Sequence, residues 1–341
     1  MTKRKILVTG GCGYIGSHMI KLLIEEGYNP IIFDNLERGY LQSKQVIEQF
    51  TKTNITFFKG DIRKIKDTDR CIEIHQPETV IHFAGYKNPG ESVKQEEKYH
   101  ENNVYGLNNL LESISRGKTT NVIFSSSCSI YGTPVSNPVI ESSFLHPESP
   151  YAESKLIGEY LIKYHSTLKK IRGIVLRYFN VCSADKSGEI GEDPSVSLNL
   201  IPKILNVHTK KENELKIFGN DYNTPDGTCI RDYIHIDDIT RAHILALKYL
   251  KNNKDINFDI FNLSTNTGYS VLEIIKEFEK QTGKKINYSF EPRRTGDPEI
   301  IFGNSQKAKN VLKWSAENNL QNIIKDVLLW TKKHPTGYNP Y

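Results

Sequence analysis

Two groups of residues in this chain have the types and spacing that hydride chemistry on an alcohol carbon requires. One is the glycine-rich run Gly10-Gly-Cys-Gly-Tyr-Ile-Gly16, which directly follows the apolar run Ile6–Val8. The other is Tyr151-Ala-Glu-Ser-Lys155, which places a phenol and an ammonium one helical turn apart. The first is typical of a loop that cradles a dinucleotide, and the second of a tyrosine base assisted by lysine. Each motif is weak alone, and the pair is much more specific.

The glycine run can hold a dinucleotide because glycines let the backbone turn tightly and approach a pyrophosphate at the start of a helix. Its spacing, GxxGxxG, differs from the GxGxxG of ordinary dehydrogenases. Asp34 ends the next apolar run and is expected to bond the adenosine ribose, where a carboxylate repels the 2′-phosphate of NADP and favours NAD. Arg38 lies near enough to leave NADP open. Gly60-Asp61-Ile62 is expected to meet the adenine ring.

The catalytic group is expected on a helix that begins at Ser149-Pro150, with serine as the N-cap and proline at the first helical position. A free tyrosine titrates near pH ~10, too high for a base at neutral pH. The ammonium of Lys155 and the positive nicotinamide ring are expected to lower the pKa of Tyr151 toward the working range. Lys155 is also expected to bond the nicotinamide ribose. Ser125-Ser-Ser127 directly follows the apolar run Val122–Phe124, and a hydroxyl at this strand end is expected to hold the reacting oxygen and share its proton with Tyr151.

The elements that must position these motifs are short apolar runs alternating with segments of helical spacing. Strands buried on both faces are expected at Ile6–Val8, Ile31–Phe33, Ile55–Phe58, Val80–Phe83, Val122–Phe124 and Ile174–Leu176. Helices are expected, for example, at His18–Glu26 and from Val104 to Ile114, ending at Gly117. This alternation predicts an α/β fold with a doubly wound parallel (Rossmann) sheet. The motifs then fall at the carboxyl ends of the strands, where such sheets bind ligands.

The composition of the chain changes from about Val181, where glycine, proline and acidic residues gather between short segments with helical or strand-like patterns. We therefore expect an NAD-binding Rossmann domain over residues 1–180, which also takes segments near 232–265. A smaller, mixed α/β substrate-binding lobe is expected over residues 181–341.

Composition narrows the class of protein. The 341 residues include 38% hydrophobic and 25% charged residues with a formal net charge of only +5, which indicates a soluble globular enzyme. No basic run is interleaved with aromatic residues, so nucleic acid is not an expected partner. The five cysteines are scattered and form no metal-ligand pattern, so neither a metal nor a disulfide framework is expected. No signal peptide or membrane-spanning run is expected, which predicts a cytoplasmic protein.

Further motifs along nearly the whole chain resemble the extended short-chain dehydrogenase/reductase family, and within it the enzymes that epimerise UDP-glucose at C4. The specific ones are His82-Phe-Ala-Gly-Tyr-Lys87 followed by Gly90-Glu-Ser-Val93, Leu176-Arg-Tyr-Phe-Asn180, Ile217 to Tyr222, Asp226 to His235, Pro292-Arg-Arg294 and Gly296-Asp297. The resemblance implies interconversion of UDP-glucose and UDP-galactose in galactose metabolism, through a transient 4-keto sugar on tightly bound NAD. The lobe over 181–341 would then bind the UDP-sugar.

The resemblance also implies roles for individual residues. The catalytic residues would be Ser127, Tyr151 and Lys155. The NAD contacts would be Gly10, Gly13, Tyr14, Ile15, Gly16, Asp34, Asn35, Asp61, Ile62, Phe83, Ala84, Gly85, Lys87, Asn102, Ser127, Tyr151, Lys155 and Phe179. The substrate contacts would be Lys87, Ser127, Tyr151, Asn180, Asn199, Leu200, Phe218, Arg231, Arg294, Asp297 and Ile301. Arg231 and Arg294 offer forked donors to a diphosphate, and Asp297 can accept from the uridine ribose.

Two positions depart from the family pattern. Cys128-Ser129 follows Ser127, where related 4,6-dehydratases place Asp-Glu and related decarboxylases keep a glutamate, so both of those chemistries are disfavoured. The alternative functions are another NAD-dependent nucleotide-sugar epimerase, a 4,6-dehydratase, or an NAD-sensing scaffold without turnover. Ile301 lies where the family has a gate: a small residue admits N-acetylated sugars and tyrosine excludes them. Isoleucine is intermediate, so UDP-N-acetylglucosamine and its galactosamine epimer stay open as substrates.

The resemblance finally implies a homodimer through helices near Val93 to Ser115 and Tyr151 to Lys169. Apolar and aromatic residues on the second helix could line that interface or face the sheet, and the sequence leaves both open. They are Tyr160, Leu161, Tyr164 and Leu168.

Overall fold

The computed structural model describes residues 3–168, 170–194, 197–294 and 296–338. The contacts within the chain divide it into two compact units. Unit 1 comprises Met1–Ile130, Pro147–Arg177 and Thr240–Phe261, and unit 2 comprises Tyr131–His146, Tyr178–Ile239 and Asn262–Tyr341. The functional division that we expect, over 1–180 and 181–341, stays a prediction, and Lys169 lies outside the described residues.

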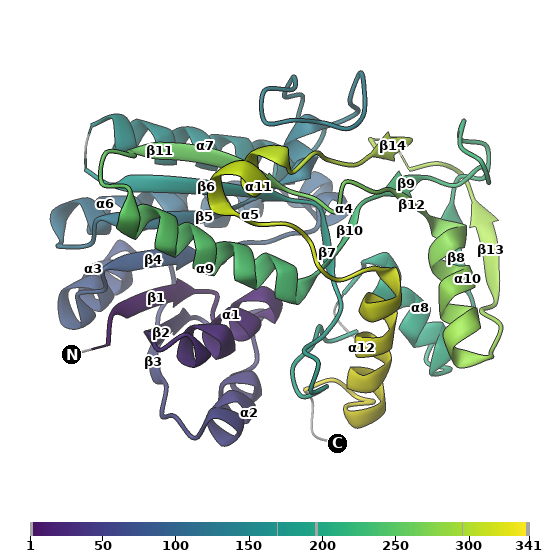
Figure 1. The fold of residues 1–341 in the computed structure, drawn as a ribbon, viewed down its shortest axis with the longest axis horizontal. Helices are drawn as coiled ribbons and strands as arrows, with labels where there is room; N and C mark the ends of the chain where they lie inside the picture. Colours follow the sequence, from purple (N-terminus) through teal and green to yellow (C-terminus); the bar gives the residue numbers. More distant parts are fainter. Residues whose placement is uncertain (1–2, 169, 195–196, 295, 339–341) are drawn as a thin grey trace. The chain divides into compact units, whose positions relative to one another are not determined.

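Unit 1 is built on a seven-stranded sheet with the order β11-β6-β5-β4-β1-β2-β3 (Figure 1). Its strands are β1 (Lys5–Thr9), β2 (Asn29–Asp34), β3 (Thr56–Lys59), β4 (Thr79–His82), β5 (Asn121–Ser127), β6 (Arg172–Tyr178) and β11 (Phe258–Leu263). Strand β1 pairs in parallel with β2 and β4, and the β2–β3 and β4–β5 pairs are parallel as well. The predicted Rossmann sheet is therefore confirmed, with β4 as its central strand.

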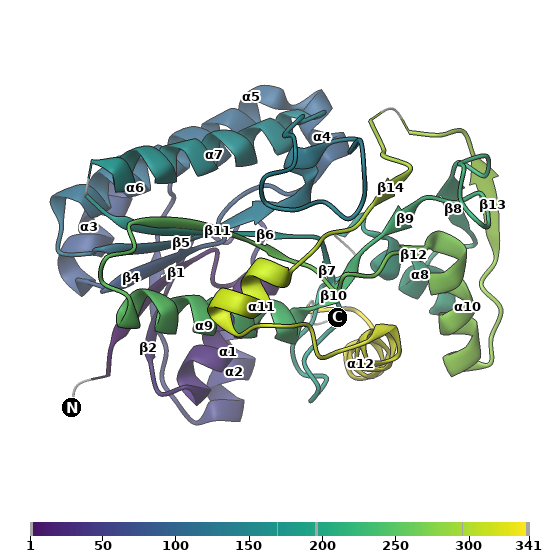
Figure 2. The same ribbon diagram turned by 45° about the horizontal axis from the view of Figure 1, so that its top comes forward.

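Helices cover both faces of this sheet. They are α1 (Tyr14–Glu25), α2 (Leu41–Thr51), α3 (Ile65–His75), α4 (Pro89–Lys94), α5 (Glu96–Tyr99), α6 (Gly106–Arg116), α7 (Pro150–Thr167) and α9 (Ile236–Asn252), with a 3-10 turn at Cys128–Tyr131. Figure 2 shows α3, α6 and α7 on one face and α1, α2 and α9 on the other. The first face buries apolar residues of α6, among them Leu107, Leu110 and Ile114, against Val80 and Val122 of the sheet.

Three expectations about these elements were wrong in detail. Strand β3 is not buried on both faces, because it forms an edge of the sheet and its residues Thr56 and Lys59 are exposed. Helix α1 begins at Tyr14 and not at His18. The helix expected from Val104 is α6, which starts at Gly106 and continues a π-helical turn over His100–Tyr105.

Unit 2 is a mixed α/β structure with three small sheets among its described residues, of orders β10-β7, β12-β9-β14 and β13-β8. The strands are β7 (Asn180–Cys182), β8 (Leu215–Phe218), β9 (Ile230–Arg231), β10 (Tyr233–His235), β12 (Tyr269–Ser270), β13 (Tyr288–Glu291) and β14 (Ile300–Ile301). The helices are α8 (Leu200–His208), α10 (Val271–Thr282), α11 (Gln306–Leu312) and α12 (Leu320–Lys333). A core of apolar residues from α8, α10 and α12 holds this unit together. In the described part of the chain, no helix is long and apolar enough to cross a membrane.

Candidate functional site

The glycine-rich turn between β1 and α1 leaves room for a ligand only because it lacks side chains. Gly10 adopts a φ of 70°, and a Cβ at Gly16 would lie 2.1 Å from the carbonyl oxygen of Gly10. The N-cap of α1 is Gly13, so no side chain caps the first turn of the helix. The N–H groups and the positive dipole end of this first turn suit a pyrophosphate. The turn, which includes Tyr14 and Ile15 at the start of α1, therefore fits a dinucleotide.

Asp34 ends β2 beside this turn and is buried. Its carboxylate accepts hydrogen bonds from the backbone N–H of Cys12 at 2.9 Å and of Leu36 at 2.8 Å. Burial raises the pKa of Asp34, and these two hydrogen bonds oppose that rise. Asp34 therefore holds the loop after β2 against the glycine-rich turn, at the position where the ribose of adenosine is expected.

The neighbouring polar residues belong to the same edge of the sheet. The side-chain amide of Asn35 donates to the Asp61 carboxylate at 3.3 Å, and Ile62 beside it is buried. Arg38, whose place in the sequence left NADP open as the cofactor, donates to the Glu91 carboxylate at 2.7 Å. The guanidinium of Arg38 is thus paired with a carboxylate instead of pointing alone at the ribose position.

The loop after β4 carries the next group of expected NAD contacts. The ring of Phe83 lies 4.9 Å from the ring of His243, and the ammonium of Lys87 lies 5.6 Å from the ring centroid of Tyr14. A Cβ on Gly10 would lie 2.8 Å from the backbone nitrogen of Ala84, so this loop is pressed against the glycine-rich turn. Two further expected NAD contacts are Gly85 of this loop, which is exposed, and Asn102, which is buried in the π-helical turn.

The catalytic group is assembled by β5 and α7. As predicted, the Ser149 hydroxyl caps α7 by accepting from the N–H of Ala152, and Pro150 is the first helical residue. The hydroxyl of Tyr151 is hydrogen-bonded to that of Ser127 at the end of β5. The Ser127 hydroxyl in turn accepts from that of Ser129 at 3.0 Å. Three hydroxyl groups therefore form a chain that ends at the expected base.

Lys155 lies one turn further along α7, completely within the protein. Its ammonium donates to the carbonyl oxygen of Ser125 at 2.8 Å and lies 6.0 Å from the ring centroid of Tyr151. Burial lowers the pKa of Lys155 to about 8, opposed by the charge of Glu159.

The side chains around Tyr151 do not by themselves lower its pKa, and the lowering that we expect with the nicotinamide bound stays a prediction. Burial raises the pKa of Tyr151 to about 12; the hydrogen bond with Ser127 opposes the rise, and Cys128 adds to it. Tyr151 and Lys155 lie one helical turn apart on α7 as predicted, and removal of the phenol from water penalises the phenolate form. A positive charge near the phenol would oppose this rise.

Glu159 is a residue of this site that sequence reasoning missed. Its carboxylate accepts from both Nε and Nη2 of Arg177, at 2.9 and 2.6 Å, and from the Ser126 hydroxyl. The side chains of this ion pair are only 2% and 4% exposed, so it lies in the interior behind Lys155. Glu159 follows Lys155 by the same four positions that separate Lys155 from Tyr151, and that spacing could have indicated it.

The buried ammonium predicts a pH dependence of stability. The pKa of Lys155 is about 8 in the folded protein against an ordinary value of 10.5, so above pH 8 the unfolded chain binds a proton that the folded chain has lost. Stability attributable to Lys155 therefore rises with pH, by up to ~2 kcal/mol between pH 8 and about pH 9.5. Urea unfolding of nucleotide-free protein should show this gain, and Lys155→Met should lack it. An equal gain in both proteins would contradict the assignment.

The expected substrate residues lie in unit 2. Arg231 ends β9 and forms an ion pair with Asp297, while it also donates to the carbonyl oxygen of Ile230 at 2.7 Å. The guanidinium of Arg294 lies 3.6 Å from the ring centroid of Phe218, at the end of β8. These four residues form a cationic and aromatic cluster suited to a nucleoside diphosphate. In the ligand-free protein Asp297 balances the charge of Arg231.

The other expected residues of unit 2 lie at the ends of its elements. Ile301 pairs with Arg231 through β14 and β9 and is buried. Asn199 is the N-cap of α8, with no side-chain hydrogen bond to the helix, and Leu200 is the first residue of the helix. Phe179 is buried and Asn180 begins β7.

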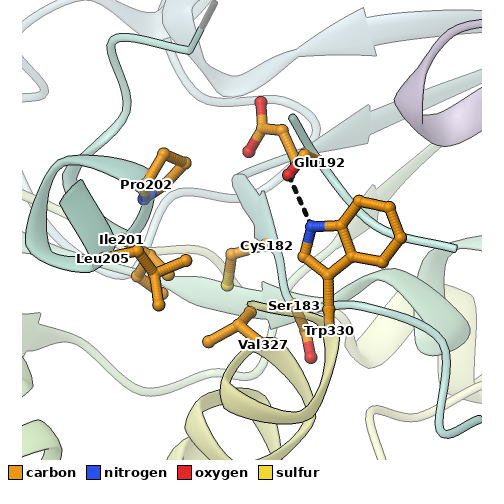
Figure 3. Close-up of a pocket in the computed structure, with 8 residues that line it drawn as sticks. All are labelled: Cys182, Ser183, Glu192, Ile201, Pro202, Leu205, Val327 and Trp330. Atoms are coloured by element: carbon orange, nitrogen blue, oxygen red, sulfur yellow. Dashed lines mark hydrogen bonds between the residues drawn. The ribbon is translucent and has the colours of Figure 1, made fainter. Parts of the chain in front are cut away.

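One enclosed pocket of unit 2 plays no part in this site. It is a cavity of about 10 Å³, lined by Cys182, Ser183, Glu192, Ile201, Pro202, Leu205, Val327 and Trp330 (Figure 3). The indole N–H of Trp330 donates to the carbonyl oxygen of Glu192 at 3.0 Å. A cavity of this size holds about one water molecule, so it is a packing defect of the core and not a substrate site.

Comparison with known proteins agrees with this geometry. A family model described as GDP-mannose 4,6 dehydratase matches residues 7–327. A UDP-glucose 4-epimerase of Halalkalibacterium halodurans is 40% identical over 335 residues, which cover 98% of this chain and 97% of that protein.

Solved structures are similar over the same length. The UDP-glucose 4-epimerase of Bifidobacterium longum in complex with NAD+ and UDP superposes with a TM-score of 0.93 at 36% identity, over 98% of this chain and 99% of that one. The UDP-Glc/GlcNAc 4-epimerase of Campylobacter jejuni gives a TM-score of 0.84 at 33% identity, over 97% and 99%. Taken with the glycine-rich turn and the Ser127, Tyr151 and Lys155 group, these similarities show that the chain belongs to the extended short-chain dehydrogenase/reductase family, among its UDP-glucose 4-epimerases.

Proposed function

We propose that this chain interconverts UDP-glucose and UDP-galactose through a transient 4-keto sugar, using NAD that stays bound between turnovers. The observation that carries the proposal is the Tyr151 hydroxyl bonded to Ser127, with the ammonium of Lys155 buried one helical turn away. This arrangement stands in a chain that is 40% identical over nearly its full length to a UDP-glucose 4-epimerase.

In this mechanism Ser127 holds the 4-hydroxyl of the sugar and Tyr151 removes its proton. NAD, held by the residues around the glycine-rich turn, would supply the acceptor for the C4 hydride and the source of its return to the other face of the sugar ring. Bound NAD would bring a positive nicotinamide ring that favours the phenolate of Tyr151 and opposes the rise of its pKa. Tyr151 then returns the proton to the oxygen of the product, so the reaction has no net redox change.

The residues that would hold NAD are those around the glycine-rich turn and Asp34, with Lys155 on the nicotinamide ribose. The residues of unit 2 would hold the nucleotide: Arg231 and Arg294 the diphosphate, and Asp297 the uridine ribose. Few of the proposed contacts address the sugar itself. This suits the reaction, because the keto sugar must present both of its faces while the diphosphate stays clamped.

The match to the family model of GDP-mannose 4,6 dehydratase makes 4,6-dehydration the alternative reaction to consider. Dehydration needs a further acid and base beside the sugar, and the positions after Ser127 hold Cys128 and Ser129. The Ser129 hydroxyl is already bonded to Ser127, and a serine hydroxyl is a weak acid. The structure therefore favours epimerisation.

The proposed gate at Ile301 predicts how substrate choice can be changed. Ile301→Ser should raise kcat/KM for UDP-N-acetylgalactosamine by about tenfold, because it opens space for the acetyl group without adding a charge. Ile301→Tyr should lower that value by a similar factor while turnover of UDP-galactose continues. Both substrates are followed in a coupled assay. Equal changes for both substrates would show that Ile301 acts on folding and not on selection.

We further propose a homodimer that works in the cytoplasm. Tyr160, Tyr164 and Leu168 of α7 are 58%, 60% and 47% exposed, and Val93 of α4 is 66% exposed, whereas Leu161 packs against the core of unit 1. Such a row of exposed apolar side chains favours a protein partner, and a second copy is the partner implied by the family. The five cysteines are free thiols, as expected in a reducing compartment.

The test of the proposed function is turnover of UDP-galactose by the purified chain without added NAD. Product formation would support an epimerase with retained cofactor. Folded protein that stays inactive even with NAD supplied would contradict the proposal and favour the dehydratase and scaffold alternatives.

A further inference from the structure

A hydrogen bond crosses the cofactor edge of unit 1 between two loops that are distant in sequence. The hydroxyl of Tyr86, in the loop after β4, donates to the carboxylate of Glu37, in the loop after β2. In the sheet β1 lies between β2 and β4. The bond therefore passes over the carboxyl end of β1, where the glycine-rich turn begins.

The Tyr86 end of this bond is rigid. The side chain is only 5% exposed, and its ring packs against that of Tyr99 at a centroid distance of 5.4 Å. The backbone is held twice by one side chain: the N–H of Tyr86 donates to Asn103 at 2.9 Å, and its carbonyl accepts from Asn103 at 3.0 Å. These contacts therefore fix the position of Tyr86 on one side of the glycine-rich turn.

Glu37 is also bonded to the loop after β3, the third loop at this edge of the sheet. Arg63, which follows β3, donates to Glu37 at 3.0 Å and also pairs with Asp61. The N–H of Glu37 donates to the side chain of Asn35 at 2.9 Å. The loops that carry the expected adenosine contacts, Asn35 and Asp61, are therefore connected through Glu37 to Tyr86.

Two ion pairs lie beside the ring of Tyr86. Arg38 pairs with Glu91 at 2.7 Å and lies 5.4 Å from the ring centroid of Tyr86, but its side chain is 52% exposed. Lys98 pairs with the same carboxylate at 3.0 Å and lies 4.5 Å from the same ring. The side chain of Glu37 is itself 37% exposed, but the hydroxyl that donates to it belongs to a residue that is only 5% exposed. Because ion pairs between exposed side chains contribute little, we expect loss of the Tyr86–Glu37 bond to matter more than loss of the Arg38–Glu91 pair.

We propose that Tyr86 and Glu37 form a strap over the glycine-rich turn that controls how fast NAD leaves this chain. The inference rests on the proposed function, since that places NAD on this turn. A dinucleotide lying there cannot depart until the two loops separate, and their separation breaks the bond. Retention matters for an epimerase, because loss of reduced cofactor during a cycle would strand the keto sugar. Tyr86 and Glu37 are then positioning residues and take no part in the chemistry.

The test is the rate at which purified holoenzyme releases NAD into a large excess of buffer, measured as nucleotide per chain against time. Tyr86→Phe keeps the packed ring and removes the hydroxyl, and it should release NAD about tenfold faster, as expected for one hydrogen bond to a charged group. Glu37→Gln should accelerate release in the same direction. With saturating NAD, kcat for UDP-galactose should stay within about twofold of the unmodified chain, because the catalytic group is untouched.

Tyr249→Phe is the matched control. It removes another tyrosine–carboxylate hydrogen bond of unit 1, between Tyr249 of α9 and Asp259 of β11, away from the cofactor edge. Its release rate should equal that of the unmodified chain. Unchanged release in Tyr86→Phe, or an equal acceleration in Tyr249→Phe, would overturn the strap alone. Retention of NAD without epimerase turnover would overturn the proposed function and leave the strap standing, while a chain that binds no NAD would overturn both.

Discussion

Tyr151→Phe is expected to lower kcat for UDP-galactose by about 10³-fold, because it removes the group that takes the proton from the 4-hydroxyl. The substitution deletes one oxygen and keeps the ring, which lies 6.4 Å from that of Tyr99 in a cluster of buried aromatic residues. The fold and the amount of bound NAD should therefore be retained. A coupled assay of the holoenzyme at saturating substrate measures the change.

The control variant for this prediction is Tyr249→Phe, which should keep the full kcat of the unmodified chain. Circular dichroism and the NAD content of both variants establish that they are folded and loaded. If Tyr151→Phe kept more than about a tenth of the activity, another group would have to be the base.

Breaking the buried pair behind the catalytic group should have the largest effect on stability. Glu159→Gln leaves the guanidinium of Arg177 buried without a countercharge, and we expect a loss of about 3–5 kcal/mol in the free energy of unfolding. The double variant Glu159→Gln, Arg177→Met should recover most of that loss, because it removes the uncompensated charge as well. Urea unfolding of all three proteins provides the measurement.

An exposed ion pair of the same unit is the control for this prediction. Arg116 and Asp69 lie 2.6 Å apart with side chains 53% and 44% exposed, so Asp69→Asn should cost no more than ~1 kcal/mol. Equal losses for Asp69→Asn and Glu159→Gln would mean that burial of Glu159 has no energetic consequence. A double variant no more stable than Glu159→Gln would place the cost in lost packing instead of charge.

Much of the scaffold could be predicted from local sequence. Central strands such as β1 and β4 are continuous apolar runs because both faces are covered by helices. The start of α7 at Ser149-Pro150 follows from capping chemistry, which is local to a few residues. The position of β3 at the sheet edge could not be read in this way, since its apolar residues resemble those of a central strand.

The features that sequence missed depend on contacts between distant segments. The π-helical turn before α6 leaves no spacing signal that separates it from an α-helix. The raised pKa of Tyr151 follows from burial, which the spacing to Lys155 does not reveal. The Tyr86–Glu37 bond joins residues in two loops on either side of β1, and only the order of the strands brings them together.

The central claim is that the hydrogen removed from C4 of the sugar is kept by the protein and returned to the same carbon. The most direct test supplies UDP-galactose deuterated at C4 to the purified chain in ordinary water and follows the product by NMR. The account predicts UDP-glucose that retains deuterium at C4. Product that has exchanged its deuterium with water, or no product from folded and NAD-loaded protein, would contradict it.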